Sequence, residues 1–329
     1  MKCPLCDSSD YQLQAKDYQG FVENTFFDLH LCNNCLTSFV DSSKVETAIY
    51  EKIYGNKGEG GYQRYYDYAT KVKLATDKLQ FLAHEETTYL PLYDYLSKQK
   101  TKLDILEVGC GFGYTTFAVS ELGHNIAGID VASSAIDFAT KEFGNFYKHQ
   151  DVKDLDEDKK YDLIYAHEVI EHLSDTQGFI NNLKRVLKPN GVIHLTTPNK
   201  DYATKTNPSA IWLTVLPPHH IFWGTTKGLE RMAKLHSLNI SFFDFENHYG
   251  RQENRLNEVR RLKNPNLPAP VIVNNTETEV PLPMHKQFVL RLLYLPIIQQ
   301  LTTRYLTEFL NFRDYKTNAI FLMNEDESK

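Results

Sequence analysis

Four of the five cysteines in this 329-residue chain form two Cys-x-x-Cys pairs, Cys3 with Cys6 and Cys32 with Cys35. Each short turn can direct two sulfur atoms at one ion, and the segment between the pairs closes as a loop, an arrangement typical of tetrahedral thiolate sites for zinc. The sequence therefore predicts a zinc-binding module over residues 1–42. Two alternatives stay open: ordinary reduced cysteines, and a redox centre, which would need only one of the two pairs.

A second unusual stretch is ILEVGCGFGYTT, in which an apolar run ends in Glu107 and is followed by Gly109, Gly111 and Gly113. Dinucleotide-binding turns carry G-x-G-x-x-G, with the third glycine at a position that a tyrosine occupies here. The spacing G-x-G-x-G therefore disfavours NAD and FAD and favours a ligand without a pyrophosphate.

Histidine and glutamate side chains gather in two further stretches, HEVIEH from His167 to His172 and PPHHIFWGT around His219 and His220. Neutral imidazole is the natural base near pH 7, so these stretches hold the candidate acid–base groups. His220 is the first choice, because the preceding Pro-Pro pair and the following Trp-Gly turn would hold it at the mouth of a pocket. His219, His167 and Glu168 are the other candidates.

The same residues also support a divalent metal site. Glu168 and Glu171 lie three residues apart, His172 follows directly, and a distant histidine would complete the ligand set. Ligation rich in oxygen suits Mg²⁺ or Mn²⁺ rather than a structural zinc. The competing interpretation is that Glu171 and His172 only hold the loop in place.

Strands and helices alternate around these residues, which predicts an α/β fold with a doubly wound, mostly parallel sheet. In such sheets ligands bind beyond the carboxyl ends of the strands. The strands are expected at Leu103–Val108, Asn125–Ile129, Phe146–His149, Tyr161–Ala166, Val192–Thr196, Ile240–Phe245 and Asn318–Asn324, and the helices at Thr115–Leu122, Ser134–Phe143, Phe179–Leu187 and Leu229–Leu238.

The resulting organisation has five segments. They are a zinc-binding module over 1–42, a flexible and helical connector over 43–100, the ligand-binding core over 101–246, a helical insertion over 247–314, and the last strand with a tail over 315–329. We expect the amphipathic insertion to be a cap or a homodimer surface. In the connector, Tyr62, Tyr65 and Tyr66 follow a Gly-rich stretch and either close over the ligand or pack as half-buried helix residues.

With Glu107 ahead of it, the glycine stretch resembles the first motif of class I S-adenosylmethionine-dependent methyltransferases, and the resemblance covers roughly Leu103–Phe245. It implies a Rossmann-like, seven-stranded sheet and S-adenosylmethionine as cofactor. By this resemblance, Asp130 accepts from both ribose hydroxyls, Asp151 takes the adenine amino group and Val152 offers its backbone N–H to the ring. Glu107 acts on the methionine ammonium through water or the backbone. The implied cofactor-binding set is Glu107, Gly109, Cys110, Gly111, Gly113, Asp130, Val131, Asp151, Val152 and His167.

A zinc module joined to such a domain resembles bacterial sugar methyltransferases of deoxysugar and surface-polysaccharide pathways. This resemblance implies a small-molecule acceptor, with a nucleotide-linked sugar or glycan as the first choice. The glutamate–histidine stretch is also similar to those of quinone-ring and RNA 2′-O-methyltransferases that use a divalent ion. A non-catalytic alternative is a zinc-ribbon adaptor that holds S-adenosylmethionine without turnover.

The composition limits the partners and the location. A net charge of −6 argues against a general nucleic-acid surface, and 42% hydrophobic with 12% aromatic residues supports a folded core. The chain shows no leader peptide and no run approaching about 18 apolar residues, so we expect a cytoplasmic protein without a transmembrane segment.

Overall fold

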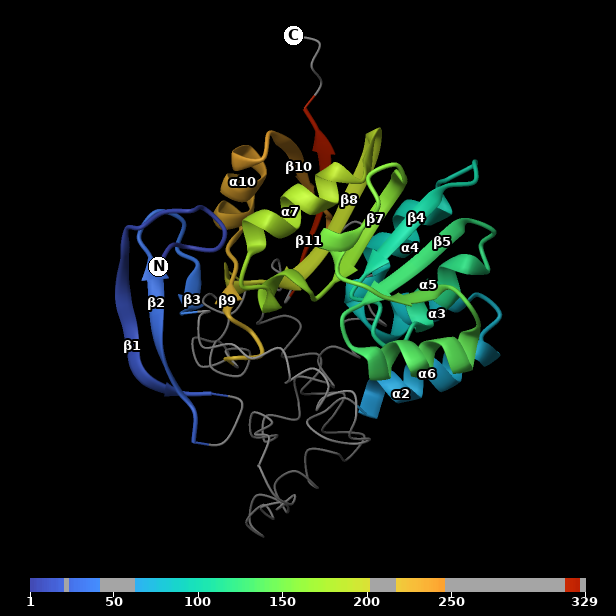
Figure 1. The fold of residues 1–329 in the computed structure, drawn as a ribbon, viewed down its shortest axis with the longest axis horizontal. Coiled ribbons are helices and arrows are strands. Elements are labelled where there is room, and N and C mark those ends of the chain that lie inside the picture. Colours follow the sequence, from blue (N-terminus) through green and yellow to red (C-terminus); the bar gives the residue numbers. More distant parts are fainter. Residues whose placement is uncertain (21–23, 42–62, 202–216, 246–316, 326–329) are drawn as a thin grey trace, which may run out of the picture. The chain divides into compact units, whose positions relative to one another are not determined.

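The structure analysed is a computed structural model (Figure 1), and it describes residues 1–20, 24–41, 63–201, 217–245 and 317–325. The predicted insertion over 247–314, with the homodimer surface expected on it, lies outside these residues. So do Tyr62 and the part of the connector before Gln63.

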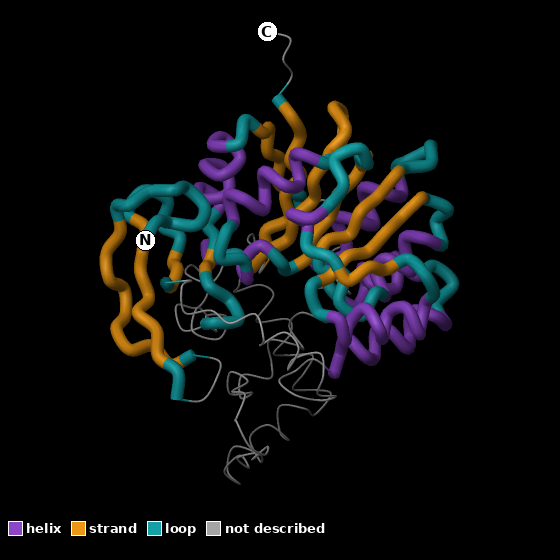
Figure 2. The backbone as a smooth tube through the Cα atoms, viewed as in Figure 1, coloured by secondary structure: helices purple, strands orange, loops and turns teal. Residues whose placement is uncertain are grey.

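One sheet of seven strands forms the centre of the described residues, in the order β10-β11-β8-β7-β4-β5-β6. Figure 2 shows the strands in orange and the helices in purple. The pairs from β8 through β7, β4 and β5 to β6 are parallel, and only β11 runs antiparallel to both of its neighbours. The predicted mostly parallel, seven-stranded α/β fold is confirmed. The strands are β4 Asp104–Val108, β5 Asn125–Asp130, β6 Tyr147–His149, β7 Tyr161–His167, β8 Leu187–Pro198, β10 Leu238–Phe242 and β11 Thr317–Asn324.

Alternate residues of the central strands belong to two hydrophobic cores, one on each face of the sheet, because successive side chains of a strand point to opposite sides. Leu106 and Ile164 pack with α7 (Thr176–Arg185) and α10 (Thr226–Leu235). Ile105 and Leu163 pack with the helices of the other face. Those helices are α2 Gln63–Lys71, α3 Lys78–Glu85, α4 Leu90–Ser97, α5 Tyr114–Ser120 and α6 Ser133–Phe143.

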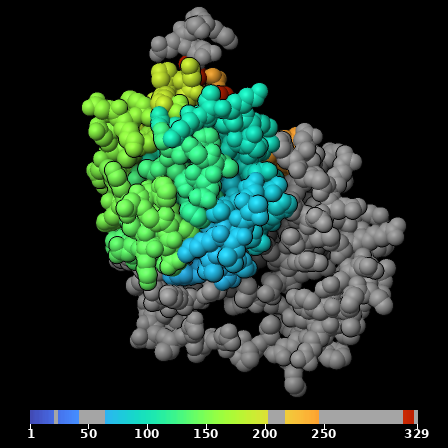
Figure 3. Space-filling model, turned by 90° about the vertical axis from the view of Figure 1, so that its right-hand side faces the viewer, coloured from blue at the N-terminus to red at the C-terminus, as the bar shows by residue number. Residues whose placement is uncertain are grey.

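The connector ahead of the core is divided into short helices rather than continuing as one. The 3-10 turns Val72–Leu74 and Thr87–Tyr89 separate α2, α3 and α4, and Asp77 begins α3 by accepting a hydrogen bond from the Gln80 N–H at 2.9 Å. Figure 3 views this side of the molecule, where α2 to α4, light blue to teal, lie beside the green residues of α5 and α6.

Several predicted boundaries were wrong. β8 begins at Leu187 rather than Val192, since Leu187 already pairs with Tyr161 and the Pro-Asn-Gly segment forms an irregularity within the strand pair. β10 begins at Leu238, which the sequence predicts as part of the preceding helix; α10 instead ends at Leu235.

A second sheet of four antiparallel strands carries the two cysteine pairs. Its order is β1-β2-β3-β9, from Tyr11–Gln19, Phe26–Cys32, Ser38–Val40 and Phe222–Trp223. The sequence predicts a turn at Trp223, but β3 offers an open edge on which Phe222 and Trp223 pair. Leu5, Leu29 and Phe39 of this module share the hydrophobic core of α7 and α10.

Among the described helices, none combines the length and the apolar composition that crossing a membrane would require.

Candidate active site

The glycine loop follows β4 and has a left-handed backbone at each of its three glycines. The φ angles of Gly109, Gly111 and Gly113 are +74°, +48° and +77°, a region that residues with a Cβ rarely adopt. Side chains of the protein itself also crowd this loop. A Cβ at Gly109 would lie 2.5 Å from Val169 Cγ2, and one at Gly113 would lie 2.6 Å from the Tyr147 ring.

Asp130 ties the glycine loop to the end of β5. Its Oδ2 accepts from the Gly111 N–H at 2.8 Å and its Oδ1 from the Ala132 N–H at 2.9 Å. The side chain is buried. A carboxylate oxygen has two lone pairs and can accept more than one hydrogen bond. This geometry is consistent with the predicted ribose contact, which stays a prediction.

Glu107 lies beneath the loop, in a buried network of hydroxyls. Thr116 Oγ1 donates to its Oε2, and Tyr165 OH donates to the same oxygen at 3.0 Å. Burial raises the pKa of the Glu107 carboxyl to about 8, although these hydrogen bonds act in the opposite direction. The sequence pointed to Glu107 but not to its two partners, which lie on the next helix and on a neighbouring strand.

The other predicted cofactor residues lie at the ends of neighbouring strands. Asp151 follows β6, is partly exposed, and accepts from the Lys153 N–H at 3.1 Å. Val152 is buried, whereas Val131 is 52% exposed after β5. Cys110 is a buried thiol whose pKa is raised by burial.

Glu168 follows β7 in an unusual backbone conformation, with a φ of +52°. Non-glycine residues in this region are uncommon and are concentrated at functional sites. Its N–H donates to Thr196 O at 3.1 Å, and its carboxylate accepts from Thr88 Oγ1 at 3.3 Å. Burial raises the pKa of this carboxyl to about 7. The next residue, Val169, is the one that faces Gly109, so this segment adjoins the glycine loop.

Glu171 has no exposed surface, and neither of its carboxylate oxygens finds a hydrogen-bond partner in the part of the chain that the structure describes. Burial, followed by the charge of Glu168, raises its pKa well above the usual value. Its Oε1 lies 3.8 Å from His172 Nε2. A buried carboxyl of this kind must hold a proton or meet a cation.

Three histidines meet beside Glu171. The ring centroid of His172 lies 4.4 Å from that of His219 and 4.8 Å from that of His220. Each of the three residues offers one ring nitrogen as a ligand atom, and these atoms lie within 4.8 Å of one another. We call these residues the histidine cluster. His172 Nδ1 lies 2.5 Å from the His219 carbonyl oxygen, which can only accept, so Nδ1 carries the proton and Nε2 keeps its lone pair.

Two members of the histidine cluster, His172 and His219, favour the neutral imidazole form, which is the one that binds metals. Burial lowers the pKa of His172 to about 4 and that of His219 well below its usual value. Of the predicted metal ligands, only His172 belongs to this group of converging ligand atoms, together with His219 and His220; Glu168 and Glu171 are not part of it. The cluster is richer in imidazole than the predicted set.

His167 lies apart from this cluster. Both ring nitrogens are buried without a hydrogen-bond partner among the described residues. Its ring centroid lies 5.1 Å from that of Tyr165, 5.3 Å from that of Tyr89 and 5.4 Å from that of His194. Burial lowers its pKa well below the usual value, so the ring is neutral.

Aromatic side chains of α2 pack on the glycine loop. The ring centroids of Tyr66 and Phe112 are 4.2 Å apart, and Tyr65 stacks on Tyr114 at 6.5 Å. Tyr114 also shares a 2.6 Å hydrogen bond with Tyr89. Sequence reasoning noted the tyrosines of α2 but had no signal for the partners, which lie about 45 residues away.

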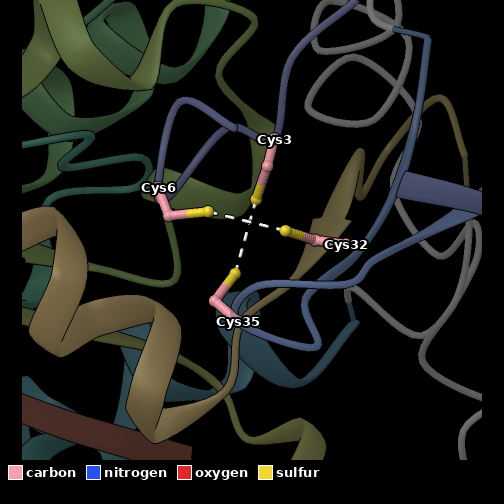
Figure 4. Close-up of side chains that lie close together, drawn as sticks. All are labelled: Cys3, Cys6, Cys32 and Cys35. Atoms are coloured by element: carbon pink, nitrogen blue, oxygen red, sulfur yellow. Dashed lines mark hydrogen bonds between the residues drawn. The ribbon is translucent and has the colours of Figure 1, made fainter. Parts of the chain in front are cut away.

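The four cysteines of the amino-terminal module point toward one another (Figure 4); Cys32 ends β2, and the other three lie in turns beside the second sheet. Cys3 Sγ lies 3.5 Å from Cys35 Sγ, and Cys6 Sγ lies 3.5 Å from Cys32 Sγ. A tetrahedral site with Zn–S bonds of about 2.3 Å requires sulfur atoms about 3.8 Å apart, so the four thiols fit the group. Cys110 belongs to the other hydrophobic core.

Comparison with known proteins identifies the central part of the chain. Residues 81–241 match a family model described as a methyltransferase domain. This region is therefore a methyltransferase domain, and the class of protein that the glycine motif predicted is confirmed.

Two curated relatives are ubiquinone biosynthesis O-methyltransferases. That of Rickettsia conorii is 39% identical over 122 residues, which are 35% of this chain and 42% of the relative. That of Rickettsia canadensis is 39% identical over 105 residues, which are 30% and 44%. The chain spans less than half the length of these relatives. A solved magnesium protoporphyrin IX methyltransferase from Synechocystis is 15% identical, with a TM-score of 0.44 over 60% of this chain and 91% of that one.

Proposed function

We propose that this protein is an S-adenosylmethionine-dependent O-methyltransferase that acts on a small molecule with a hydroxyl group. The observation that carries the proposal is the juxtaposition of two sites at one edge of the sheet. The glycine loop follows β4, the HEVIEH stretch follows its parallel neighbour β7, and Val169 lies against Gly109.

In the reaction, the acceptor oxygen attacks the methyl carbon of the sulfonium, the carbon–sulfur bond breaks, and S-adenosylhomocysteine leaves. The protein mainly supplies proximity and orientation for this displacement. Asp130 and the glycine loop hold the cofactor, and a base must take the acceptor proton. His220 remains our first choice for that base, with His219, His167 and Glu168 as alternatives.

A divalent ion fits the same place. Glu171 has two buried oxygens without partners in the described residues, and the ligand atoms of His172, His219 and His220 lie within 4.8 Å of one another. Glu168 is the neighbouring carboxylate. When bound, such an ion lowers the pKa of an acceptor hydroxyl. The imidazole content shifts the preference from Mg²⁺ toward Mn²⁺ or a softer first-row ion.

The relatives support the acceptor class. Both are named for ubiquinone biosynthesis, which favours a phenolic precursor of a quinone over the nucleotide-linked sugar that the sequence suggested first. For the amino-terminal module we propose one structural zinc ion per chain, held by Cys3, Cys6, Cys32 and Cys35.

The test is a turnover assay. The purified protein is incubated with S-adenosylmethionine, and S-adenosylhomocysteine release is measured with a catechol or polyprenyl phenol, a nucleotide-linked sugar, or an RNA oligonucleotide. We expect product with the phenol, stimulated by Mn²⁺ or Mg²⁺. Product only with the sugar or the RNA would overturn the acceptor class. Tight cofactor binding without turnover on any acceptor would favour the adaptor.

A further inference from the structure

We infer that the cysteine module, residues 1–20 and 24–41, positions the histidine cluster, so that loading the four sulfurs with zinc orders His219 and His220. The inference rests on the proposed zinc but not on the proposed methyl transfer. No cysteine of the module belongs to the histidine cluster.

Strand pairing provides the first link. Phe222 and Trp223, which follow the two histidines by one residue, pair with Phe39 and Ser38 of β3. Among the described strands, β9 has no neighbour in its sheet other than β3. The backbone just after the histidines is therefore held by the module.

Ile221 connects the module directly to the candidate active site. Its N–H donates to the carbonyl oxygen of Glu171 at 2.9 Å, and its own carbonyl oxygen accepts from the Val40 N–H at 2.9 Å. One residue after His220 thus bridges the HEVIEH stretch and the module. A displacement of β3 would therefore disturb the backbone hydrogen bonds of Ile221 directly.

Side-chain contacts strengthen the link near the sulfur ligands. Thr225 Oγ1 donates to the carbonyl oxygen of Cys35 at 2.5 Å, and Lys200 Nζ donates to that of Leu36. Ahead of the histidines, Gly20 approaches Pro217 so closely that a Cβ on Gly20 would lie 2.5 Å from the Pro217 carbonyl oxygen. The module therefore contacts the chain on both sides of the histidine pair.

The energetic argument follows from the size of the module. Fewer than about 40 residues seldom hold a fold without a metal, a disulfide or a larger partner. Thiolate zinc sites supply folding free energy directly, since the site does not exist in the unfolded chain. Loss of the ion should therefore free the edge of β3 and, with it, Ile221 and the histidine pair.

The experiment follows local order rather than activity. Trp223 is fully buried and becomes the only tryptophan when Trp212 is replaced by phenylalanine. In the full-length Trp212→Phe protein we compare the zinc-loaded form with a Cys35→Ser variant. We expect a red-shifted Trp223 emission and at least about tenfold faster hydrogen exchange at the Ile221 amide. S-adenosylmethionine affinity, measured by calorimetry, should stay within about threefold.

A second variant keeps the inference testable if Cys35→Ser unfolds the whole chain. Lys200→Met removes the contact with Leu36 and leaves all four sulfurs in place. We expect it to retain zinc and to raise the Ile221 exchange rate several-fold, with Lys188→Met, which acts on Asp104 and Asp162 instead, as the matched control. Unchanged Ile221 exchange and Trp223 emission in both Cys35→Ser and Lys200→Met would overturn the inference. Absence of methyl transfer would leave these readouts intact.

Discussion

Asp130 and Glu171 are two buried carboxyl groups, one at the carboxyl end of β5 and one shortly after β7, the two strands that flank β4, and they differ in how the chain satisfies them. Each oxygen of Asp130 accepts a backbone N–H, from Gly111 and from Ala132. Neither oxygen of Glu171 has a partner among the described residues, although its side chain is fully buried. Backbone N–H groups therefore satisfy Asp130, whereas Glu171 requires a bound proton or a cation.

Under the proposed function, this difference bears on the two halves of the reaction, cofactor binding and acceptor activation. Burying an unpaired carboxylate is expensive, so a site that keeps one must gain from it when occupied. The cofactor half needs no ion for its geometry. The acceptor half, with Glu171 and the histidine cluster, is the half that should respond to pH and to metals.

The largest effect should come from the histidine cluster. His220→Ala should lower turnover by roughly 10²–10⁴-fold, the usual worth of a general base, while cofactor affinity stays nearly unchanged. The exposed His84 provides the matched control, His84→Ala. Steady-state kinetics with and without a chelator tests both the general-base and the metal interpretation of the site. Near-normal turnover in His220→Ala without chelator sensitivity would remove both the base and the metal interpretation.

A smaller effect is expected on the cofactor side. In Asp130→Asn the amide NH₂ would face one of two backbone N–H donors, and the charge that attracts the ribose hydroxyls would be lost. The binding free energy of the cofactor should weaken by about 1.5–3 kcal/mol, the range for hydrogen bonds to a charged group. Calorimetry compares it with Asp137→Asn, an exposed position on α6. Equal affinities in the two variants would contradict the assignment of Asp130.

The pH dependence of stability should separate the two carboxyl groups. The pKa of Glu171 is raised in the folded protein, so the folded state binds more protons than the unfolded state and stability falls as pH rises. In metal-free protein between pH 7 and 8.5, one such group contributes a slope of up to about 1.4 kcal/mol per pH unit. Near pH 7 histidines in the unfolded state still bind some protons and act in the opposite direction, so the contribution of Glu171 is the difference between wild type and a Glu171 variant.

Urea unfolding of wild type and Glu171→Gln at several pH values measures this slope. The Glu171→Gln variant should lose the contribution of Glu171 to this slope. Mn²⁺ should flatten the plot of unfolding free energy against pH for the wild type but not for the variant. Parallel curves for the two proteins would show that Glu171 is ionised or paired.

The smallest effect should come from α2. Tyr66→Leu removes the ring contacts with Phe112 and Phe138, and should reduce the free energy of unfolding by about 0.5–1.5 kcal/mol. Tyr93→Leu, a partly buried tyrosine on α4, is the control. Thermal unfolding with and without S-adenosylmethionine distinguishes two roles of Tyr66. If Tyr66 only packs against the glycine loop, the variant lowers both unfolding midpoints equally. If Tyr66 closes over the cofactor, the variant mainly lowers the stabilisation that the cofactor provides.

Local patterns predicted much of the fold and part of the candidate site. Alternation of apolar strands and helices predicted the parallel sheet, and Gly109, Gly111 and Gly113 predicted a turn that only glycine tolerates, as their positive φ angles confirm. Boundaries failed where long-range pairing decided them. β8 extends back to Leu187 because Tyr161 is there to pair with it.

By itself, the sequence determined the sheet, the loop that follows its first parallel strand and the four-cysteine site, since these depend on backbone preferences and residue spacing over short stretches. Only the tertiary structure decided that His172 meets His219, 47 residues away, that Tyr165 supports Glu107, and that β9 joins the cysteine module. Burial raised the pKa of Glu171 well above its usual value. Desolvation depends on every group that surrounds a side chain, and those groups come together only when the chain is folded.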